Sequence, residues 1–392
     1  MSLPFLITTV RVSVIALLAA IVAACAQTPP APEIIELLPG VGEVDLETSS
    51  SAPAELDQLD IGILVFENQL DAQDKERFGD WVYTEIRENE VHYLPYVLRN
   101  TLLDTNYWGA IRVLPQTDPS VDLQINGTVL HSDGERLEIA IVASDSTGKR
   151  WLDKTYADTT NLSDYPEATR FTTGNRFNPA GFVDPFQDLY DQVANDLLNI
   201  RRSFTDAQLT NLKQVSAMVY ASDLSPETFA HTLTSSEDGL LTVNSLLADS
   251  DPMLARVADM RLRHLLFIDT VDEYYQALYE EMQPSYVIWR RYSHDQIEED
   301  QRLASRLRDY DLDDYGTSRS FVSLTQRYDR YRWSKIYEQE FRELAAGFNR
   351  ELAPAILRLN EQVHGVSGTM DEQYIQWRRI LQALFKLETE QM

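Results

Sequence analysis

The sequence predicts an α+β protein, in which a small domain of the order β-α-β-meander-α precedes a larger all-α helical bundle. Apolar and polar residues alternate from Asp122 to Tyr156, as is typical of antiparallel strands. Two short apolar runs, at residues 61–66 and 111–114, have the composition of buried strands. After Phe204, helix-start signals and apolar spacings of three and four residues dominate.

We expect four segments along the chain. These are a signal peptide at residues 1–24, a lipidated cysteine with a disordered tether at residues 25–58, an α/β domain at residues 59–204 and a helical domain at residues 205–392. The tether is expected because its prolines stand among Ala, Ser, Thr and acidic residues, a composition that favours an extended chain.

The amino-terminal apolar run is too short to cross a membrane. Arg11 is the only charged residue in residues 1–24, and residues 12–24 carry no charge. As a helix, this run would rise about 20 Å at ~1.5 Å per residue, which is less than the ~30 Å thickness of a hydrocarbon core. The run therefore indicates an export signal rather than a membrane span.

A short motif follows the apolar run. Val22, Ala23 and Ala24 precede Cys25, which is the only cysteine in the chain. This pattern resembles the lipobox of bacterial lipoproteins. The resemblance implies cleavage before Cys25, a diacylglycerol group on its sulfur and a fatty acyl chain such as palmitate on its new amino terminus. Because Ala26 follows instead of Asp, the sorting rule of such lipoproteins implies the cell outer membrane. We favour the periplasmic side for the body, and the outer face is the alternative. The alternative is an ordinary secretory signal with a chance cysteine.

The composition excludes some partners. The chain carries 62 acidic and 34 basic residues, a net charge of −28. Nucleic acid is a poor partner because phosphate backbones require Lys and Arg. Anionic lipid surfaces would also repel this body, so we expect an acyl anchor to hold it at a membrane. A single cysteine allows no intrachain disulfide, so packing must stabilise the fold.

Local signals place the first elements of the α/β domain. Residues 61–66 predict the first strand. Pro95 predicts the start of a helix, because its missing N–H costs nothing in a first turn. Residues 111–114 predict the second strand.

Turn residues then divide the meander. Ser132-Asp133-Gly134 and residues 145–148 supply the positive φ angles of tight hairpins, and Trp151 to Tyr156 close the meander. Asp184-Pro185 predict a helix cap. The stripe that follows consists of Phe186, Leu189, Tyr190, Val193, Leu197 and Ile200.

This order of elements, carried by the helix at residues 94–103, the strand at 108–114 and the meander at 122–156, resembles a known family. It is similar to the small α/β domain shared by the amino-terminal part of TolB, the curli secretion protein and the outer-membrane lipoproteins that activate peptidoglycan synthases. The match runs from Ile61 to about Phe204. The resemblance implies a binding or assembly module, without catalytic residues to carry over.

The sequence predicts helices in the second half of the chain. Ser225-Pro226 and Asp251-Pro252 are helix-start signals, and Thr369 with Glu372 forms a capping box. We expect an irregular bundle of six or seven helices. Its apolar stripes include Tyr275, Leu278, Tyr279 and Met282, and, in the last helix, Tyr374, Trp377, Leu381 and Leu384.

No motif for metal or nucleophilic chemistry is complete. Residues 309–314 are acidic like a calcium loop, but Asp314 stands where Gly is needed and Ser320 where Glu is needed, so we interpret them as an acidic loop. Ser367 lies between glycines with a spacing one residue too short for a nucleophile elbow. We interpret Gly365 as a helix C-cap and Gly368 as part of a turn. We expect no metal, cofactor or catalytic residue.

Aromatic and arginine residues are interleaved in two runs of the helical half. Core packing explains them most simply, while a protein interface enriched in Tyr, Trp and Arg or a saccharide groove are the alternatives. The candidate interface residues are Tyr274, Tyr275, Trp289, Arg290, Arg291, Tyr328, Tyr331 and Trp333.

These observations predict a lipid-anchored outer-membrane protein that acts as an adaptor or assembly factor in the cell envelope, with a protein partner and no enzymatic activity. The alternative is a module that binds peptidoglycan or another glycan, or regulates cell-wall synthesis. A hydrolase assembled from distant residues is a third hypothesis.

Overall fold

A computed structural model describes residues 38–54, 57–69, 84–165, 182–245, 247–248, 251–309, 352–359 and 362–390. Contacts divide the chain into Met1–Leu38 and Pro39–Met392, and all elements below lie in the second unit. The signal peptide, the lipobox and Cys25 lie outside the described residues, as do Tyr328, Tyr331 and Trp333.

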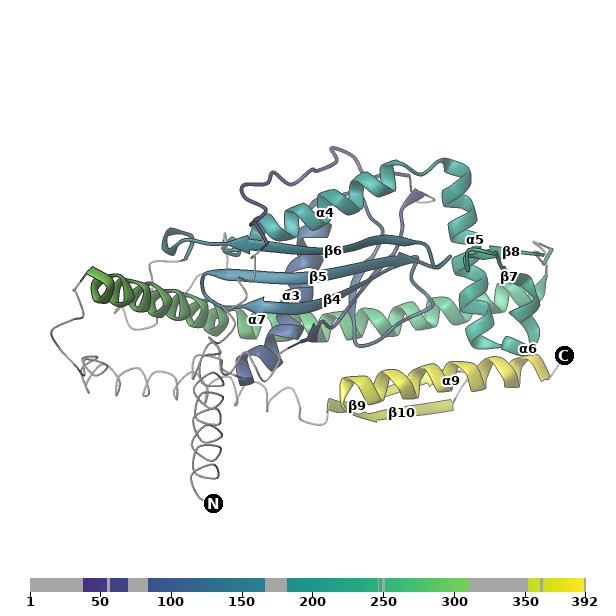
Figure 1. The fold of residues 1–392 in the computed structure, drawn as a ribbon. Helices are drawn as coiled ribbons and strands as arrows, with labels where there is room; N and C mark the ends of the chain where they lie inside the picture. Colours follow the sequence, from purple (N-terminus) through teal and green to yellow (C-terminus); the bar gives the residue numbers. More distant parts are fainter. Residues whose placement is uncertain are drawn as a thin grey trace, which may run out of the picture. The chain divides into compact units, whose positions relative to one another are not determined.

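The α/β part is built on one mixed sheet (Figure 1). Its strand order is β3-β1-β4-β5-β6; β1 runs parallel to both β3 and β4, and β4, β5 and β6 form an antiparallel meander. A two-residue strand, β2, pairs with β4. This arrangement confirms the predicted fold class. The strands are β1 (Ile61–Leu64), β2 (Glu67–Asn68), β3 (Ile111–Leu114), β4 (Leu123–Ser132), β5 (Arg136–Asp145) and β6 (Arg150–Thr159).

The alternating residues of the meander bury one face of the sheet. Ile125 of β4 and Ile139 and Ile141 of β5 are fully or almost fully buried, whereas the residues between them are partly exposed. Register pairs Val129 with Ile139, so apolar side chains lie next to one another across strands. The predicted strands and the positions of both turns are therefore confirmed. Gly148 has the expected positive φ, of 85°, but Ser132, Asp133 and Gly134 do not, so the prediction of a positive φ in the first turn was wrong.

Helix α3 (Thr84–Asp104) contains Pro95 in its interior, so the prediction that Pro95 opens a helix was wrong. An internal proline leaves the carbonyl four residues earlier without its donor. Here that carbonyl, of Val91, accepts a hydrogen bond of 3.0 Å from the backbone N–H of Phe66. The helix therefore continues through Pro95 because the chain after β1 supplies the missing donor.

Helix α4 (Gln187–Arg202) begins two residues after the predicted cap, and the short η3 helix (Leu162–Asp164) precedes it in the chain. Asp184 still acts at this terminus, because its Oδ1 accepts the N–H of Phe186 at 3.0 Å. The predicted stripe is buried except at Ile200, which is partly exposed.

Part of the predicted tether packs on the α/β layer. The N–H of Val41 donates to the carbonyl of Ala157 in β6, and the N–H of Ser49 donates to Thr105 after α3, both at 2.8 Å. The N–H of Glu47 donates to Asn195 Oδ1 of α4 at 2.8 Å. Residues 41–49 therefore belong to the folded body, and the predicted boundary at residue 58 lies too far along the chain.

The second half contains long helices, as predicted, but two β-hairpins interrupt them. The predicted start signals are confirmed at Pro226 and Pro252, and the Thr369–Glu372 capping box is present. The elements are α5 (Asp206–Leu224), α6 (Pro226–Phe229), η4 (Ala230–Thr232), β7 (Leu233–Ser235), β8 (Leu241–Val243), α7 (Pro252–Asp309), β9 (Leu352–Leu359), β10 (Gln362–Gly368) and α9 (Met370–Glu390).

Gly365 lies within β10, paired with Ile356 of β9, so its interpretation as a helix C-cap was wrong. Gly368 has a φ of 108° and leads into the capping box, as expected for a turn. Ser367 stands at the end of a strand, and its N–H donates to Gln376 Oε1.

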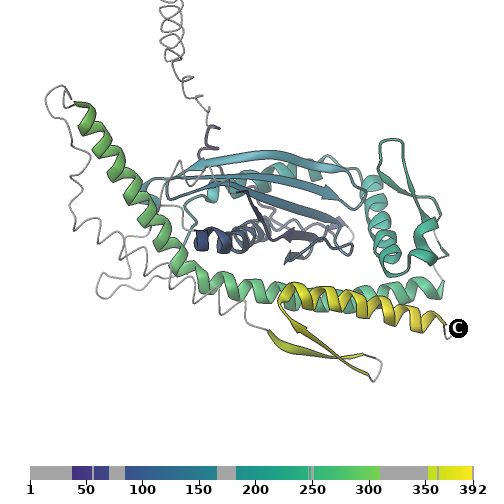
Figure 2. The ribbon, with the colours of Figure 1, turned by 60° about the horizontal axis from the view of Figure 1, so that its bottom comes forward.

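Helix α7 covers the edge of the sheet at β3 (Figure 2). Asp272 Oδ1 accepts the N–H of Val113 at 2.8 Å, and the same carboxylate pairs with Arg99 of α3 at 2.5 Å. Arg112 of β3 pairs with Asp269 at 2.6 Å. The predicted stripes on α7 and α9 lie in the same hydrophobic core as the sheet, with Tyr279 partly exposed at its margin. The boundary expected near residue 204 therefore does not separate two cores.

The tip of the β4–β5 hairpin meets α7 with almost no space between the backbones. A Cβ on Gly134 would lie 2.1 Å from the nitrogen of His294 and 2.3 Å from the oxygen of Arg290. Since both atoms are backbone atoms of a helix, neither can move without moving α7.

We therefore expect Gly134→Ala to lower the free energy of unfolding by about 2–4 kcal/mol, through overpacking against a rigid element. Urea unfolding of the full-length chain measures this. Gly40→Ala is the matched control, because its nearest contact would be an ordinary 3.4 Å. Equal stability of the two variants would contradict the close approach.

Candidate functional site

The structure buries most of the described candidate interface residues. Tyr275, Trp289 and Arg290 are 3%, 2% and 1% exposed, so their prediction as an exposed interface was wrong. Tyr274 is half-buried and packs edge-on against Tyr275, and Arg291 is partly exposed. The physical reason is that α7 turns this stripe toward α3 and the sheet, which is the core packing that the sequence allowed as the simplest explanation.

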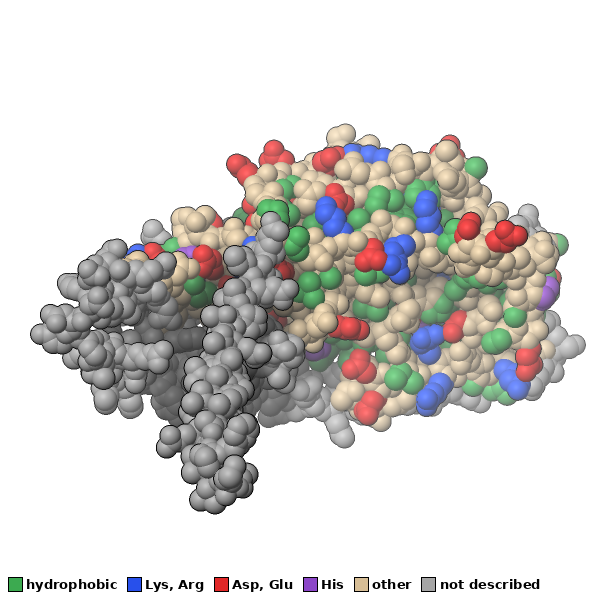
Figure 3. All heavy atoms as spheres, viewed as in Figure 1, with side chains coloured by type: hydrophobic (Ala, Val, Ile, Leu, Met, Phe, Trp, Pro, Cys, Tyr) green, Lys and Arg blue, Asp and Glu red, His purple; other side chains and the backbone are tan. Residues whose placement is uncertain are grey.

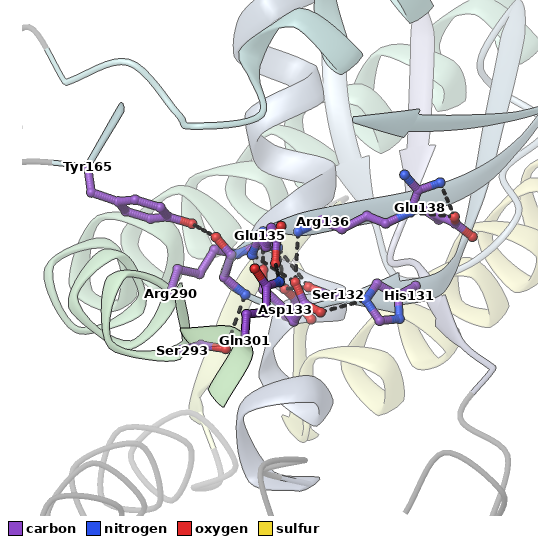
Figure 4. A network of polar contacts seen from close by, with 12 residues as sticks. His131, Ser132, Asp133, Glu135, Arg136, Glu138, Tyr165, Arg290, Ser293 and Gln301 are labelled. Atoms are coloured by element: carbon purple, nitrogen blue, oxygen red, sulfur yellow. Dashed lines mark hydrogen bonds and ion pairs between the residues drawn. The ribbon is translucent and has the colours of Figure 1, made fainter. Parts of the chain in front are cut away.

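Arg290 is the centre of a buried polar network (Figure 4). Its Nη2 donates to Glu90 Oε1 of α3 at 2.6 Å and to Ser132 Oγ of β4 at 2.7 Å. Its Nε donates to the hydroxyl of Tyr286 at 2.6 Å, and that hydroxyl and Ser132 also donate to Glu90. Burial alone would lower the pKa of Arg290, but Tyr286 and Glu90 raise it well above the ordinary value.

The same network holds the hairpin tip. Arg290 Nη1 donates to the carbonyl of Asp133 at 3.2 Å, and Ser293 Oγ accepts the N–H of Gly134 at 3.1 Å. The Tyr165 hydroxyl donates to the carbonyl of Gly134 at 2.6 Å (Figure 4). These contacts join α7, α3 and the β4–β5 hairpin.

A second buried polar group lies farther toward the start of α7. His264 Nε2 and Asp118 Oδ2 are 2.6 Å apart, and the Tyr374 hydroxyl of α9 donates to the same carboxylate oxygen. The N–H of Ser120 donates to Asp118 Oδ1 at 2.6 Å. Burial alone would raise the pKa of Asp118, but His264, Ser120 and Tyr374 hold it well below its usual range. We call Asp118, His264 and Tyr374 the Asp118 cluster.

The Asp118 cluster has catalytic residue types in a closed environment. All three side chains are at most 2% exposed, and Tyr220 stacks on the imidazole with ring centroids 5.9 Å apart. General acid–base catalysis requires a substrate proton within hydrogen-bond reach. The cluster joins the loop before β4 to α7 and α9, and Asp118 also lines a cavity described below.

Two cavities lie on either side of Asp122, which precedes β4. The Asp118 cavity has a volume of about 320 Å³, and its lining includes the polar side chains of Gln124, Ser144, Asp223 and Arg378 beside Val121 and Val219. The Lys213 cavity has a volume of about 310 Å³ and is lined by Asp60, Asp122, Lys213, Ala258, Arg261, Leu262 and Leu265. Both are open to solvent and of a size that suits a small ligand or a side chain.

Asp122 is buried between the two cavities, and its charge is balanced from several sides. Its Oδ2 accepts the N–H of Asp60 at 3.0 Å, while Lys213 Nζ and Arg261 Nη2 lie 3.6 and 3.8 Å from its oxygens. Within the described residues, no three His, Cys, Asp or Glu side chains are arranged to hold a metal ion. The helices of the described part also include none that is long and apolar enough to cross a membrane.

Sequence reasoning missed both buried networks. The partners of Arg290 and of Asp118 lie far away in the chain, so no local spacing pointed to them. One signal was present for Arg290, because it continues the apolar stripe of Tyr275, Leu278 and Met282 at helical spacing. An arginine on a buried stripe requires a buried acid elsewhere.

We expect Asp118→Asn to lower the free energy of unfolding by about 2–4 kcal/mol at pH 7, because it removes the buried charged acceptor of two side chains. The pKa of this carboxyl is lower in the folded than in the unfolded chain. The stability that the ionised Asp118 gives the folded chain is therefore fully present above about pH 4. It is lost as the pH falls through the pKa of Asp118 in the folded chain. The difference from the natural chain should shrink below pH 4 in urea unfolding.

Tyr374→Phe serves as the control, since it removes one hydrogen bond and should cost only about 1 kcal/mol. A loss for Asp118→Asn that is the same at pH 7 and pH 3 would contradict the role of the charge.

Neither a protein-family model nor a curated protein matches this chain. Solved structures show weak similarity over part of it. A PelC dodecamer from Paraburkholderia phytofirmans is 15% identical, with a TM-score of 0.22, over 38% of this chain and 92% of that chain. The hypothetical protein CT253 from Chlamydia trachomatis is 6% identical, with a TM-score of 0.21, over 38% of this chain and 99% of that chain.

Proposed function

We propose that this chain is a lipid-anchored protein of the bacterial outer membrane that acts as a non-enzymatic adaptor or assembly factor in the envelope. The observation that carries the proposal is the position of Cys25. The chain's only cysteine follows Val22-Ala23-Ala24 at the end of an apolar run too short to span a membrane. An acyl anchor there would hold a body that is too acidic to bind anionic lipid by charge.

The described body supports a binding role rather than catalysis. Its two clusters of catalytic residue types, around Arg290 and Asp118, have buried side chains that join elements of the fold. On the face in Figure 3, acidic and basic side chains are interspersed, as on a surface that stays soluble beside a membrane. Open cavities flank Asp122 on the same body and offer places for a partner.

Binding of peptidoglycan or another glycan is the second candidate. The specific observation that favours it is the Asp118 cavity, whose amide, hydroxyl, carboxylate and guanidinium groups suit the hydroxyls of a sugar. This candidate is compatible with the same anchor.

The anchor has a direct test. We expect Cys25→Ser to abolish incorporation of a palmitate analogue and to remove the protein from the outer-membrane fraction, because the lipidated sulfur is lost. Metabolic labelling and membrane fractionation measure the two effects. Ala26→Ser should keep both the label and the location. A Cys25→Ser protein that still carries label, or that stays in the outer membrane, would overturn the proposal.

The glycan candidate predicts that the protein sediments with purified cell-wall sacculi. Ser144→Trp should reduce this binding, because a large side chain would fill the Asp118 cavity. Ala140→Trp is the matched control, since it lies on the same face of β5 but does not line the cavity. No sedimentation of the natural chain, or equal binding by both variants, would count against this candidate.

A further inference from the structure

The amino-terminal half of α7 exposes an apolar ridge. Leu262 and Leu266 lie one helical turn apart and are 58% and 61% exposed. Ala255 and Ala258 are also exposed and lie on the same face, at spacings of three and four residues. We call these four residues the α7 ridge. A contiguous apolar stripe of this kind on a helix indicates a contact surface rather than scattered exposed residues.

Both edges of the six-stranded sheet already have contacts, which disfavours addition of a strand from a partner there. The β3 edge is covered by α7, where Asp272 accepts the N–H of Val113. The opposite edge, β6, receives the N–H of Val41. An occupant of the α7 ridge must therefore meet a helix face, and another helix is the element that fits it.

The α7 ridge is self-complementary. With a two-fold axis near residue 260, antiparallel packing places Ala258 of one copy against Leu262 of the second copy, and Leu262 against Ala258. Small residues thus face large ones, which lets two helices approach and interdigitate.

The charges beside the ridge favour the same orientation. Asp259 and Arg263 form an ion pair of 2.7 Å along one flank. In antiparallel two-fold packing, the same flanks of the two helices lie side by side, so Asp259 of each copy faces Arg263 of the other. The ridge also ends at Asp269 and Glu273, which share its face and limit the contact to this stretch.

We propose that two copies of this chain associate through antiparallel packing of the α7 ridge. This inference rests on the described body alone and is independent of the lipid anchor. The Lys213 cavity opens beside the ridge and shares Ala258 and Leu262 with it, so the second copy would cover its apolar wall.

Paired cysteines test the proposal, because the chain has a single natural cysteine. Two full-length chains with different tags are used, and both carry Cys25→Ser. One of them also carries Ala258→Cys, and the other carries Leu262→Cys. We expect a disulfide between the two chains on mild oxidation, in greater yield than either chain forms with itself. Ala277→Cys, exposed farther along α7, is the control partner and should give no disulfide with Ala258→Cys.

Equal yields from the control, or stronger self-pairing of each variant, would overturn the antiparallel contact. Sedimentation equilibrium of the full-length chain gives an independent measurement. The natural chain should show a dimer, Leu266→Glu should lose it, and Leu103→Glu, at an exposed site on α3, should keep it. A natural chain that stays monomeric at all concentrations would also overturn the proposal.

Discussion

The pairing of Arg290 with Glu90 is the contact on which the arrangement of this body depends. Both side chains are withdrawn from water, and a buried charge without a partner is strongly unfavourable. Any rotation or sliding of α7 would separate the guanidinium from Glu90 and Ser132 together. Gly134 also restricts the position of α7, because at this residue the hairpin tip touches the backbone of the helix. Charge and shape therefore fix α7 in one position relative to α3 and β4.

Once α7 is fixed there, its earlier turns meet their partners. Asp272 reaches the N–H of Val113 and Arg99, which covers an edge that would otherwise present unpaired backbone groups. His264, two turns nearer the start, reaches Asp118, and Tyr374 brings α9 to the same carboxylate. Asp118, His264 and Tyr374 in this way join a loop to two helices.

Sequence patterns predicted the elements whose formation depends on neighbouring residues in the chain. The meander, β3 and the helix starts at Pro226 and Pro252 follow from alternation, turns and caps. Pro95 was misplaced because the donor that replaces its N–H comes from Phe66, outside the helix. The β9–β10 hairpin was missed because Gly365 was interpreted as a helix C-cap. Glu90 and Asp118 gave no signal, since each finds its partner only after the chain has folded.

The α7 ridge lies on the outward side of the helix whose inward side carries these joints. Leu262 lines both the ridge and the Lys213 cavity, and Asp122 lines both this cavity and the Asp118 cavity. A ligand that occupies the Lys213 cavity must therefore contact or displace whatever packs on Leu262. Binding free energies are reciprocal, so association at the ridge and occupancy of the cavity change each other by the same factor. Because His264 fixes this turn of α7 to Asp118, such coupling would act through side-chain contacts at the cavity and would require no movement of the helix.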